Sequence, residues 1–264
     1  CLDAYTGQLA FWGQLGLYDD SKRDSDVSER RVISTSPASV VPSRRVVDAE
    51  GKIFIIGHGA PDSFRGSTIR VGYVAQEAAG LATVQTMAQV CLAQPGFQAW
   101  TGKAWIKNLA YSEQNSKLYP EFNLSFAPSE PVTDQLMVTL DGRLYVVRST
   151  HEGPAGFLLA QVDEMPSDAV QTANIGSGSF NPVSDTFTGS TLSARVLALR
   201  WQSLFAYRHN EAPSFGPDDV QVVVAKATMT PHAGAGITLT SGVYKLASVL
   251  SEGDVWLCRA TRHA

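Results

Sequence analysis

One order of short elements occurs three times along this chain of 264 residues. An aromatic-Thr-Gly triplet opens each copy, as Tyr5-Thr6-Gly7, Trp100-Thr101-Gly102 and Phe187-Thr188-Gly189. After the triplet come a strand-like apolar run, a polar loop, a second strand, a proline turn, a hairpin, a glycine turn and a last strand. This repetition indicates that one supersecondary unit is specified three times.

The hairpin is the most specific element of each copy. It reads VVDAEGKIFII, MVTLDGRLYVV and GITLTSGVYKL in turn, with Gly51, Gly142 and Gly242 as the turn glycines. The pair Asp141-Gly142 between alternating apolar runs is a strong hairpin signal, because glycine accepts the positive φ that a tight primed turn needs. The pattern therefore predicts an antiparallel hairpin in each copy.

These elements predict a mainly β fold of three tandem five-stranded antiparallel modules, each a small barrel or sandwich. The modules span residues 1–75, 97–165 and 180–264. Residues 76–96 are predicted to be a helical linker, because apolar residues at 74, 78, 81, 84, 88 and 91 form one stripe on a helix over about 74–92. Residues 166–179 are small and polar and predict a flexible linker.

Small β-modules favour assembly. A module of about 65 to 75 residues buries only about 60% of the surface of its unfolded chain, so it is marginally stable alone. An antiparallel sheet must also bury one face and protect its edges. We therefore expect these modules to pack on neighbours, within the chain or in an oligomer.

The composition excludes several classes of protein. Hydrophobic residues make up 44% of the chain and charged residues 17%, which is too apolar for a disordered chain. The net charge of −4 argues against a protein dedicated to nucleic acid, because such proteins carry basic patches. No apolar run approaches the length that spans a bilayer, and the N-terminal residues do not read as a signal peptide.

Three cysteines lie far apart, at Cys1, Cys91 and Cys258, without the spacing of a zinc site or a disulfide framework. This usage agrees with a reducing cytoplasm. Cys1 itself has two interpretations: removal of an initiator methionine, or processing of a lipoprotein that acylates the cysteine. Cys91 lies on the predicted helical stripe and is expected to be a small buried hydrophobe.

The sequence holds none of the common catalytic signatures, such as GxSxG, GxxxxGK[ST], HExxH or GxGxxG after a strand. No catalytic, cofactor-binding or metal-ligating residue, and no cofactor, is predicted. Isolated candidates are better explained as turn, loop or strand-end residues: His58 and His151 in glycine turns, Asp62, Asp163 and Glu164 as exposed carboxylates, His209 and His232 in loops, and Gly176–Ser179 in the flexible linker. The five tryptophans, Trp12, Trp100, Trp105, Trp201 and Trp256, could stack on sugars or bases. Core packing is the expectation for them at strand positions.

One loop stands out as a candidate for contacts with a partner. Residues 19–30 of the first module read DDSKRDSDVSER, and they are either a solvated loop or a segment that reaches a neighbouring subunit. The proposed interface residues in it are Asp20, Lys22, Arg23, Asp24, Asp26 and Glu29.

The C-terminal third carries a family resemblance. The segments FNPVSDTFTG, SARVLALRWQSL and PDDVQVVVAKATMTPHAGAGITLTSGVYKLASVLSEGDVWLCRA resemble the head-closure, or stopper, proteins of tailed bacteriophages, with Asp219-Val220-Gln221 and Gly242-Val243-Tyr244 matching the strand and hairpin of that family. The likeness covers about 80 residues well, extends by the repeat to PSEPVTDQLMVTLDGRLYVVRST in the second copy, and extends only weakly to the first. It consists of strand and turn residues rather than reactive groups.

This resemblance implies a structural protein of the virion, assembled in the host cytoplasm, that forms a head-tail connector ring of six or twelve copies. Its partners would be itself and the portal, neck or tail proteins, with DNA at most passing through the lumen and no membrane involved. Typical stoppers have one module, so three modules leave open which neck or tail ring this is.

Two other functions compete with a phage connector. A multi-module binding protein could recognise glycan, peptide or single-stranded nucleic acid through small barrels. An enzyme with a site assembled across modules is the third. The residues favour a non-enzymatic assembly protein.

Overall fold

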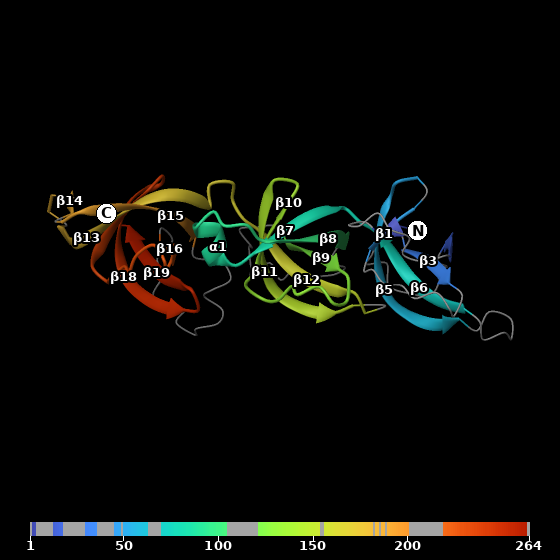
Figure 1. The fold of residues 1–264 in the computed structure, drawn as a ribbon. Helices are drawn as coiled ribbons and strands as arrows, with labels where there is room; N and C mark the ends of the chain where they lie inside the picture. The colour runs from blue at the N-terminus through green and yellow to red at the C-terminus, as the bar shows by residue number, and fades with distance from the viewer. Residues whose placement is uncertain are drawn as a thin grey trace, which may run out of the picture. The chain divides into compact units, whose positions relative to one another are not determined.

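The structure is a computed structural model that describes residues 2–3, 13–17, 30–35, 45–48, 50–62, 70–104, 121–153, 156–181, 183–184, 186–187, 189–200 and 219–262. Over these residues the fold is mainly β, with strands β1 to β19 and one short helix, α1 (Figure 1). The chain divides into two compact units. The first comprises residues 1–84, 98–115 and 120–163, and the second comprises 85–97, 116–119 and 164–264.

The N-terminal strands form one antiparallel sheet, called here the first sheet, in the order β1-β4-β5-β6-β3-β2. Its strands are β1 (Leu2–Asp3), β2 (Gly13–Leu17), β3 (Arg30–Thr35), β4 (Arg45–Val47), β5 (Ile53–Asp62) and β6 (Arg70–Glu77). Among the side chains of this sheet that the structure describes, the buried ones are Val46, Phe54, Ile55, Ile56, Ala75 and Gln76.

The next strands form a closed barrel, the middle barrel, in the order β10-β11-β12-β9-β8-β7. They are β7 (Gly80–Gln85), β8 (Phe97–Ala104), β9 (Glu121–Phe126), β10 (Met137–Leu140), β11 (Arg143–Glu152) and β12 (Leu158–Glu164). The barrel core includes Ala82, Val84, Ala99, Leu124, Phe126, Val138, Tyr145, Val147, Ala160 and Val162. These residues alternate along each strand, as the period of two requires.

The last strands form the C-terminal barrel, in the order β14-β13-β15-β16-β19-β18-β17, and pairing of β13 with β17 closes it. They are β13 (Val170–Asn181), β14 (Thr186–Phe187), β15 (Thr191–Arg200), β16 (Val220–Ala225), β17 (Ala235–Leu239), β18 (Gly242–Glu252) and β19 (Val255–Arg262). Its core includes Ala173, Ile175, Val196, Val222, Val224, Ile237, Tyr244, Leu246, Cys258 and Ala260.

One strand order underlies all three sheets. If the six main strands of each are lettered A to F along the chain, the first sheet reads A-D-E-F-C-B, and both closed barrels give the same order when read around the barrel. The repetition of one unit is therefore real at the level of topology. Its strand number was wrong, because each sheet has six main strands and not five. The strand missed in each copy is A, namely β1, β7 and β13.

The helical linker predicted for residues 76–96 was also wrong. β6 ends at Glu77, β7 runs over Gly80–Gln85, and α1 covers only Met87–Cys91. The apolar stripe satisfied a helical period, but Ala82 and Val84 also satisfy a period of two and point into the middle barrel. Closing the barrel decides between the two periods. Gly80 permits this closure, since a Cβ at Gly80 would lie 2.8 Å from Leu140 Cδ1.

The flexible linker predicted for residues 166–179 is largely strand β13. Its inward residues Ala173 and Ile175 alternate with exposed Thr172 and Asn174, and the small side chains hid this pattern. Only two residues separate β6 from β7 and five separate β12 from β13. The three strand sets therefore follow one another with short connections.

The three predicted hairpins are present as β4–β5, β10–β11 and β17–β18. Their glycines have positive φ: 84° at Gly51, 76° at Gly142 and 136° at Gly242. Asp141, with φ of 51°, and Gly142 alone connect β10 to β11, whereas Gly242 is the first residue of β18. In the first hairpin the Asp48 carboxylate accepts hydrogen bonds from the backbone N–H groups of Glu50 and Lys52, both at 2.9 Å.

Candidate functional site

The two barrels share an outward-facing row of residues across strands B, C and F. In the middle barrel Gly102 of β8 pairs with Ser125 of β9, which pairs with Leu159 of β12. In the C-terminal barrel the corresponding row is Leu197, Val223 and Leu257, from β15, β16 and β19. Neighbours of these residues along the strands, such as Leu124 and Phe126 of β9 and Val222 and Val224 of β16, belong to the cores, so both rows lie on the outside. We call the surface around each row the outer face.

On the middle barrel the outer face receives residues of the first sheet. Gln76 of β6 is fully buried and accepts a hydrogen bond of 2.6 Å from Ser125 Oγ through its Oε1. A Cβ at Gly102 would lie 2.5 Å from Gln76 Nε2 and 2.7 Å from Ser125 Oγ. The absence of a side chain at Gly102 is therefore what lets Gln76 approach.

The triplet Trp100-Thr101-Gly102, a repeat marker in the sequence, thus lies at the contact between the first sheet and the middle barrel. Thr101 is buried, and its hydroxyl donates a hydrogen bond of 3.0 Å to the carbonyl oxygen of Ser125. This bond links strands β8 and β9 beneath the row. The first triplet, at residues 5–7, lies outside the described residues.

Apolar side chains surround the polar centre of this contact. Ile55 of β5 packs in one cluster with Phe157 and Leu159, and the half-buried Trp100 and Ala78 pack against them. An ion pair adds to the contact: Arg45 of β4 lies 3.2 Å from Glu130, whose side chain is only 6% exposed. Apolar packing, the buried hydrogen bond of Gln76 and the shielded ion pair of Arg45 therefore hold the first sheet on the middle barrel.

On the C-terminal barrel the outer face is covered by helix α1, which packs against β15 and β16. Met87, Ala88, Val90 and Cys91 of the helix are buried. Thr86 and Gln89 form a capping box at its start, which satisfies two backbone N–H groups. Since five residues are too few for a stable isolated helix, α1 owes its stability to this packing.

The Cys91 thiol lies in the contact between helix α1 and the C-terminal barrel. Its Sγ donates a hydrogen bond of 3.5 Å to the carbonyl oxygen of Val223, the middle residue of the row. Burial raises the pKa of Cys91 from 9.0 to about 11, opposed by the backbone of Leu197 and the charge of Arg195. Burial also raises the pKa of Cys258, inside the barrel, to about 12. Both thiols are therefore protonated and inert near neutral pH, which agrees with the expectation for Cys91.

The outer faces of the two barrels thus both bind segments from an earlier part of the chain. The middle barrel binds the first sheet, and the C-terminal barrel binds α1. The occupants differ in structure, since one is a sheet and the other a short helix. The outer face is the candidate functional site because, in both barrels, it holds a segment from outside the barrel itself.

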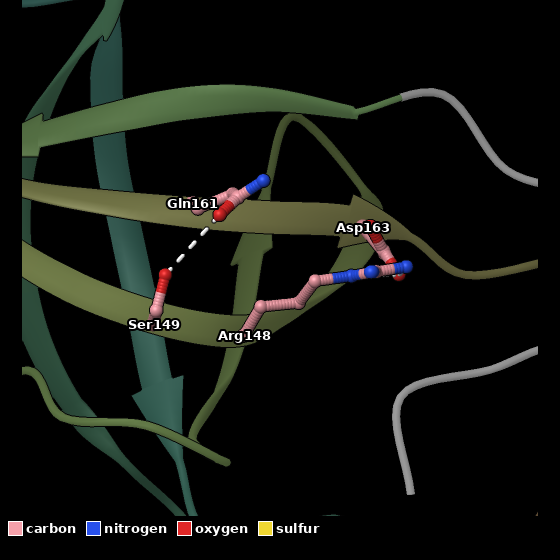
Figure 2. Close-up of polar contacts among 4 residues, drawn as sticks. All are labelled: Arg148, Ser149, Gln161 and Asp163. Carbon is pink, nitrogen blue, oxygen red and sulfur yellow. Dashed lines mark hydrogen bonds and ion pairs between the residues drawn. The ribbon is translucent and has the colours of Figure 1, made fainter. Parts of the chain in front are cut away.

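A second polar group lies on strands β11 and β12 of the middle barrel (Figure 2). Arg148 donates two hydrogen bonds to Asp163 Oδ2, one from Nε at 2.7 Å and one from a terminal nitrogen. Asp163 is fully buried, so the prediction of an exposed carboxylate was wrong. Ser149 Oγ lies 3.2 Å from Gln161 Oε1. The C-terminal barrel has a similar pair, in which Arg259 lies 2.9 Å from Asp219. We interpret these ion pairs as structural links between neighbouring strands.

The other isolated candidates lie at separate places in the part of the chain that the structure describes. His58 and His151 lie in strands β5 and β11 rather than in turns, and His151 is exposed. Asp62 and Glu164 end β5 and β12, and His232 is exposed in a turn. Residues 176–179 belong to β13 and not to a linker, while His209 lies outside the described residues.

The structure describes two of the five tryptophans and none of the predicted interface residues. Trp100 packs against the cluster of Ile55, and Trp256 packs against the core of the C-terminal barrel, so core packing is confirmed for these two. Trp12, Trp105, Trp201 and the interface residues Asp20, Lys22, Arg23, Asp24, Asp26 and Glu29 lie outside the described residues.

Two features are absent from the residues that the structure describes. No helix there is long and apolar enough to cross a membrane. No group of three or more His, Cys, Asp or Glu side chains in that part of the chain could hold a metal ion.

Comparison with known proteins gives no relative: no protein-family model matches the chain, and no curated protein or solved structure matches it either.

Proposed function

We propose that this chain is a non-enzymatic structural protein that acts through protein–protein contacts and assembles with copies of itself. The observation that carries the proposal is the outer face, which holds a segment from outside the barrel in both the middle and the C-terminal barrel. A module that repeatedly uses one surface to bind another element is suited to assembly.

The barrels also limit where partners can bind. In a closed barrel the strands have no free edges, so a partner must use a face or a loop rather than add a strand. The long B–C connections, which include the loop of Asp20 to Glu29, are the proposed contacts with neighbouring subunits. Copies joined by one recurring contact form closed rings when the rotation between them closes.

The more specific proposal, a ring in the head-tail connector or tail of a tailed phage, depends on the resemblance of the C-terminal third. Two matching positions have structural roles here. Asp219 pairs with Arg259, and Gly242 begins the second strand of the β17–β18 hairpin. These are the roles of strand and turn residues, and the phage family, the virion, the copy number of six or twelve and the portal partner follow only from the resemblance.

The test is the size and shape of the purified full chain. Light scattering should give a mass several times 28.4 kDa, and negative-stain microscopy should show rings. Addition of a portal complex should produce co-migration on a sizing column. A compact monomer that binds peptidoglycan would instead favour a glycan-binding protein and contradict the proposal.

A further inference from the structure

We propose that the outer face of the C-terminal barrel is a receptor for helix α1, and that in the assembly it takes α1 from a neighbouring copy of the chain. Copies would then be joined by exchange of one element. This inference rests on the proposed function, because it needs an assembly.

The position of α1 in the chain is the first argument. Strands β7 and β8 are neighbours in the middle barrel, and a turn of two residues suffices to join adjacent antiparallel strands. Residues 86–96 join them instead, and they carry the four buried side chains of α1. The segment 85–97 belongs to the compact unit of β13–β19, not to the unit that holds β7 and β8. This connection therefore packs on the C-terminal barrel, although the two strands that it joins belong to the middle barrel.

The complementarity of helix and face is the second argument. Met87, Val90 and Cys91 are 7%, 4% and 3% exposed, and on the face Leu197 and Val223 are both fully buried. Both partners of this contact are encoded in every copy of the chain. An α1 from one copy consequently fits the face of any other copy with the same contacts, which is the condition for exchange between protomers.

The middle barrel supplies the third argument. Its outer face holds Gln76 and Ile55 of the first sheet, so the module accepts segments of different structure at this surface. Exchange also needs a hinge, and five residues join β12 to β13. Short connections serve as hinges for such exchange when closure within one chain strains them.

A disulfide test distinguishes docking within a chain from docking between chains. In a full-length chain with Cys1→Ser and Val223→Cys, Cys91 and the new thiol face each other across the contact. Diamide at pH 9 takes up the two electrons and two protons that the thiols release on forming the disulfide. The inference predicts, on a non-reducing gel, a ladder that begins at twice the 28.4 kDa of one chain. A cross-linked species of one-chain mass, or no cross-link, would overturn it.

A two-copy experiment gives the matched control. One tagged copy keeps Cys91, and the other, with a different tag, carries Cys91→Ala and Val223→Cys; both carry Cys1→Ser. Co-expression and oxidation should yield a disulfide between the two tags. The control replaces Val223→Cys by Thr238→Cys on β17 and should give none. Rings without this disulfide would refute the exchange but leave the proposed function standing, whereas a monomeric wild-type protein would refute both.

Discussion

At the scale of single residues, two glycines illustrate different constraints. Gly142 is needed for its backbone conformation, because its φ is 76° and no atom lies within 4 Å of where a Cβ would be. Gly102 is needed for space, because a Cβ there would meet Gln76 and Ser125. The sequence indicates the first kind directly, through the Asp-Gly pair. It gives no signal for the second, since the close neighbour of Gly102 is distant in the chain.

We predict that Gly102→Ala lowers the free energy of unfolding by about 1–3 kcal/mol, the usual cost of forcing a methyl group into a packed site. Urea denaturation measures this change. Combining Gly102→Ala with Gln76→Ala should restore part of the loss, because the second change removes the nearest clashing atoms. Equal losses in the single and double variants would contradict this account of Gly102.

We predict that Gly142→Val destabilises the middle barrel by about 1–2 kcal/mol or more, since a β-branched residue tolerates positive φ poorly. Gly142→Asn is the matched control and should cost less, because asparagine enters this region more readily. Thermal unfolding of both variants is the measurement. Identical melting temperatures would show that the turn does not require the conformation seen here.

Buried ion pairs could not be predicted at this scale. Asp163 and Arg148 are 15 residues apart, and only the register of β11 and β12 makes them neighbours. The sequence placed Asp163 among exposed strand-end carboxylates for that reason. Asp219 and its partner Arg259 both lie in the segment that carries the family resemblance, but nothing in that segment indicates that they pair.

At the scale of elements, the hairpins and the strands with β-branched runs were predictable, and strand A was not. β7 and β13 consist of small or mixed residues, and apolar and polar side chains alternate only weakly along them. The same residues therefore also fitted the patterns of a helix and of a flexible linker. Barrel closure decides the outcome, and closure is a property of six strands together. The short helix α1 was predicted within a longer helix, but its docking on another barrel was not.

The docked state of α1 gives a prediction about pH. A thiol whose folded pKa is raised stabilises the fold fully below its unfolded pKa of 9.0, and this stability is lost as the pH rises through the folded value, about 11 for Cys91 and about 12 for Cys258. We therefore expect the free energy of unfolding to fall between pH 9 and about 12.

Urea denaturation across this pH range measures the effect, with Cys91→Ala as the comparison. The variant lacks one of the two thiols and should show a shallower alkaline fall than the parent chain. A labelling reagent should modify Cys91 slowly at pH 8 and rapidly in urea. Rapid labelling of the folded chain at pH 8 would mean that α1 is not docked.

At the scale of the whole molecule, one topology is used three times, and in the two barrels the outer face is the surface of contact. Sequence repetition predicts three units with approximate limits. The structure adds that two of these units, the first sheet and the middle barrel, lie together in one compact unit. The sequence could not indicate this grouping, because it depends on contacts such as that of Gln76 with Ser125.

The proposed interface loop belongs to this scale. We predict that deletion of residues 20–29 leaves the sheets folded but weakens assembly, because the loop contributes contacts rather than core. Circular dichroism should be unchanged apart from the lost residues, and the mass in solution should fall toward that of one chain. A deletion of equal length that unfolds the protein would show that the loop supports the first sheet.

The short connections between strand sets have a consequence for how such a protein can change over generations. Each set is contiguous in the chain, so gain or loss of a complete set breaks no ladder in the others. A partial gain or loss would leave a barrel open. Homologous proteins should consequently differ in length by whole multiples of the repeat, with smaller insertions confined to the segments that join strands.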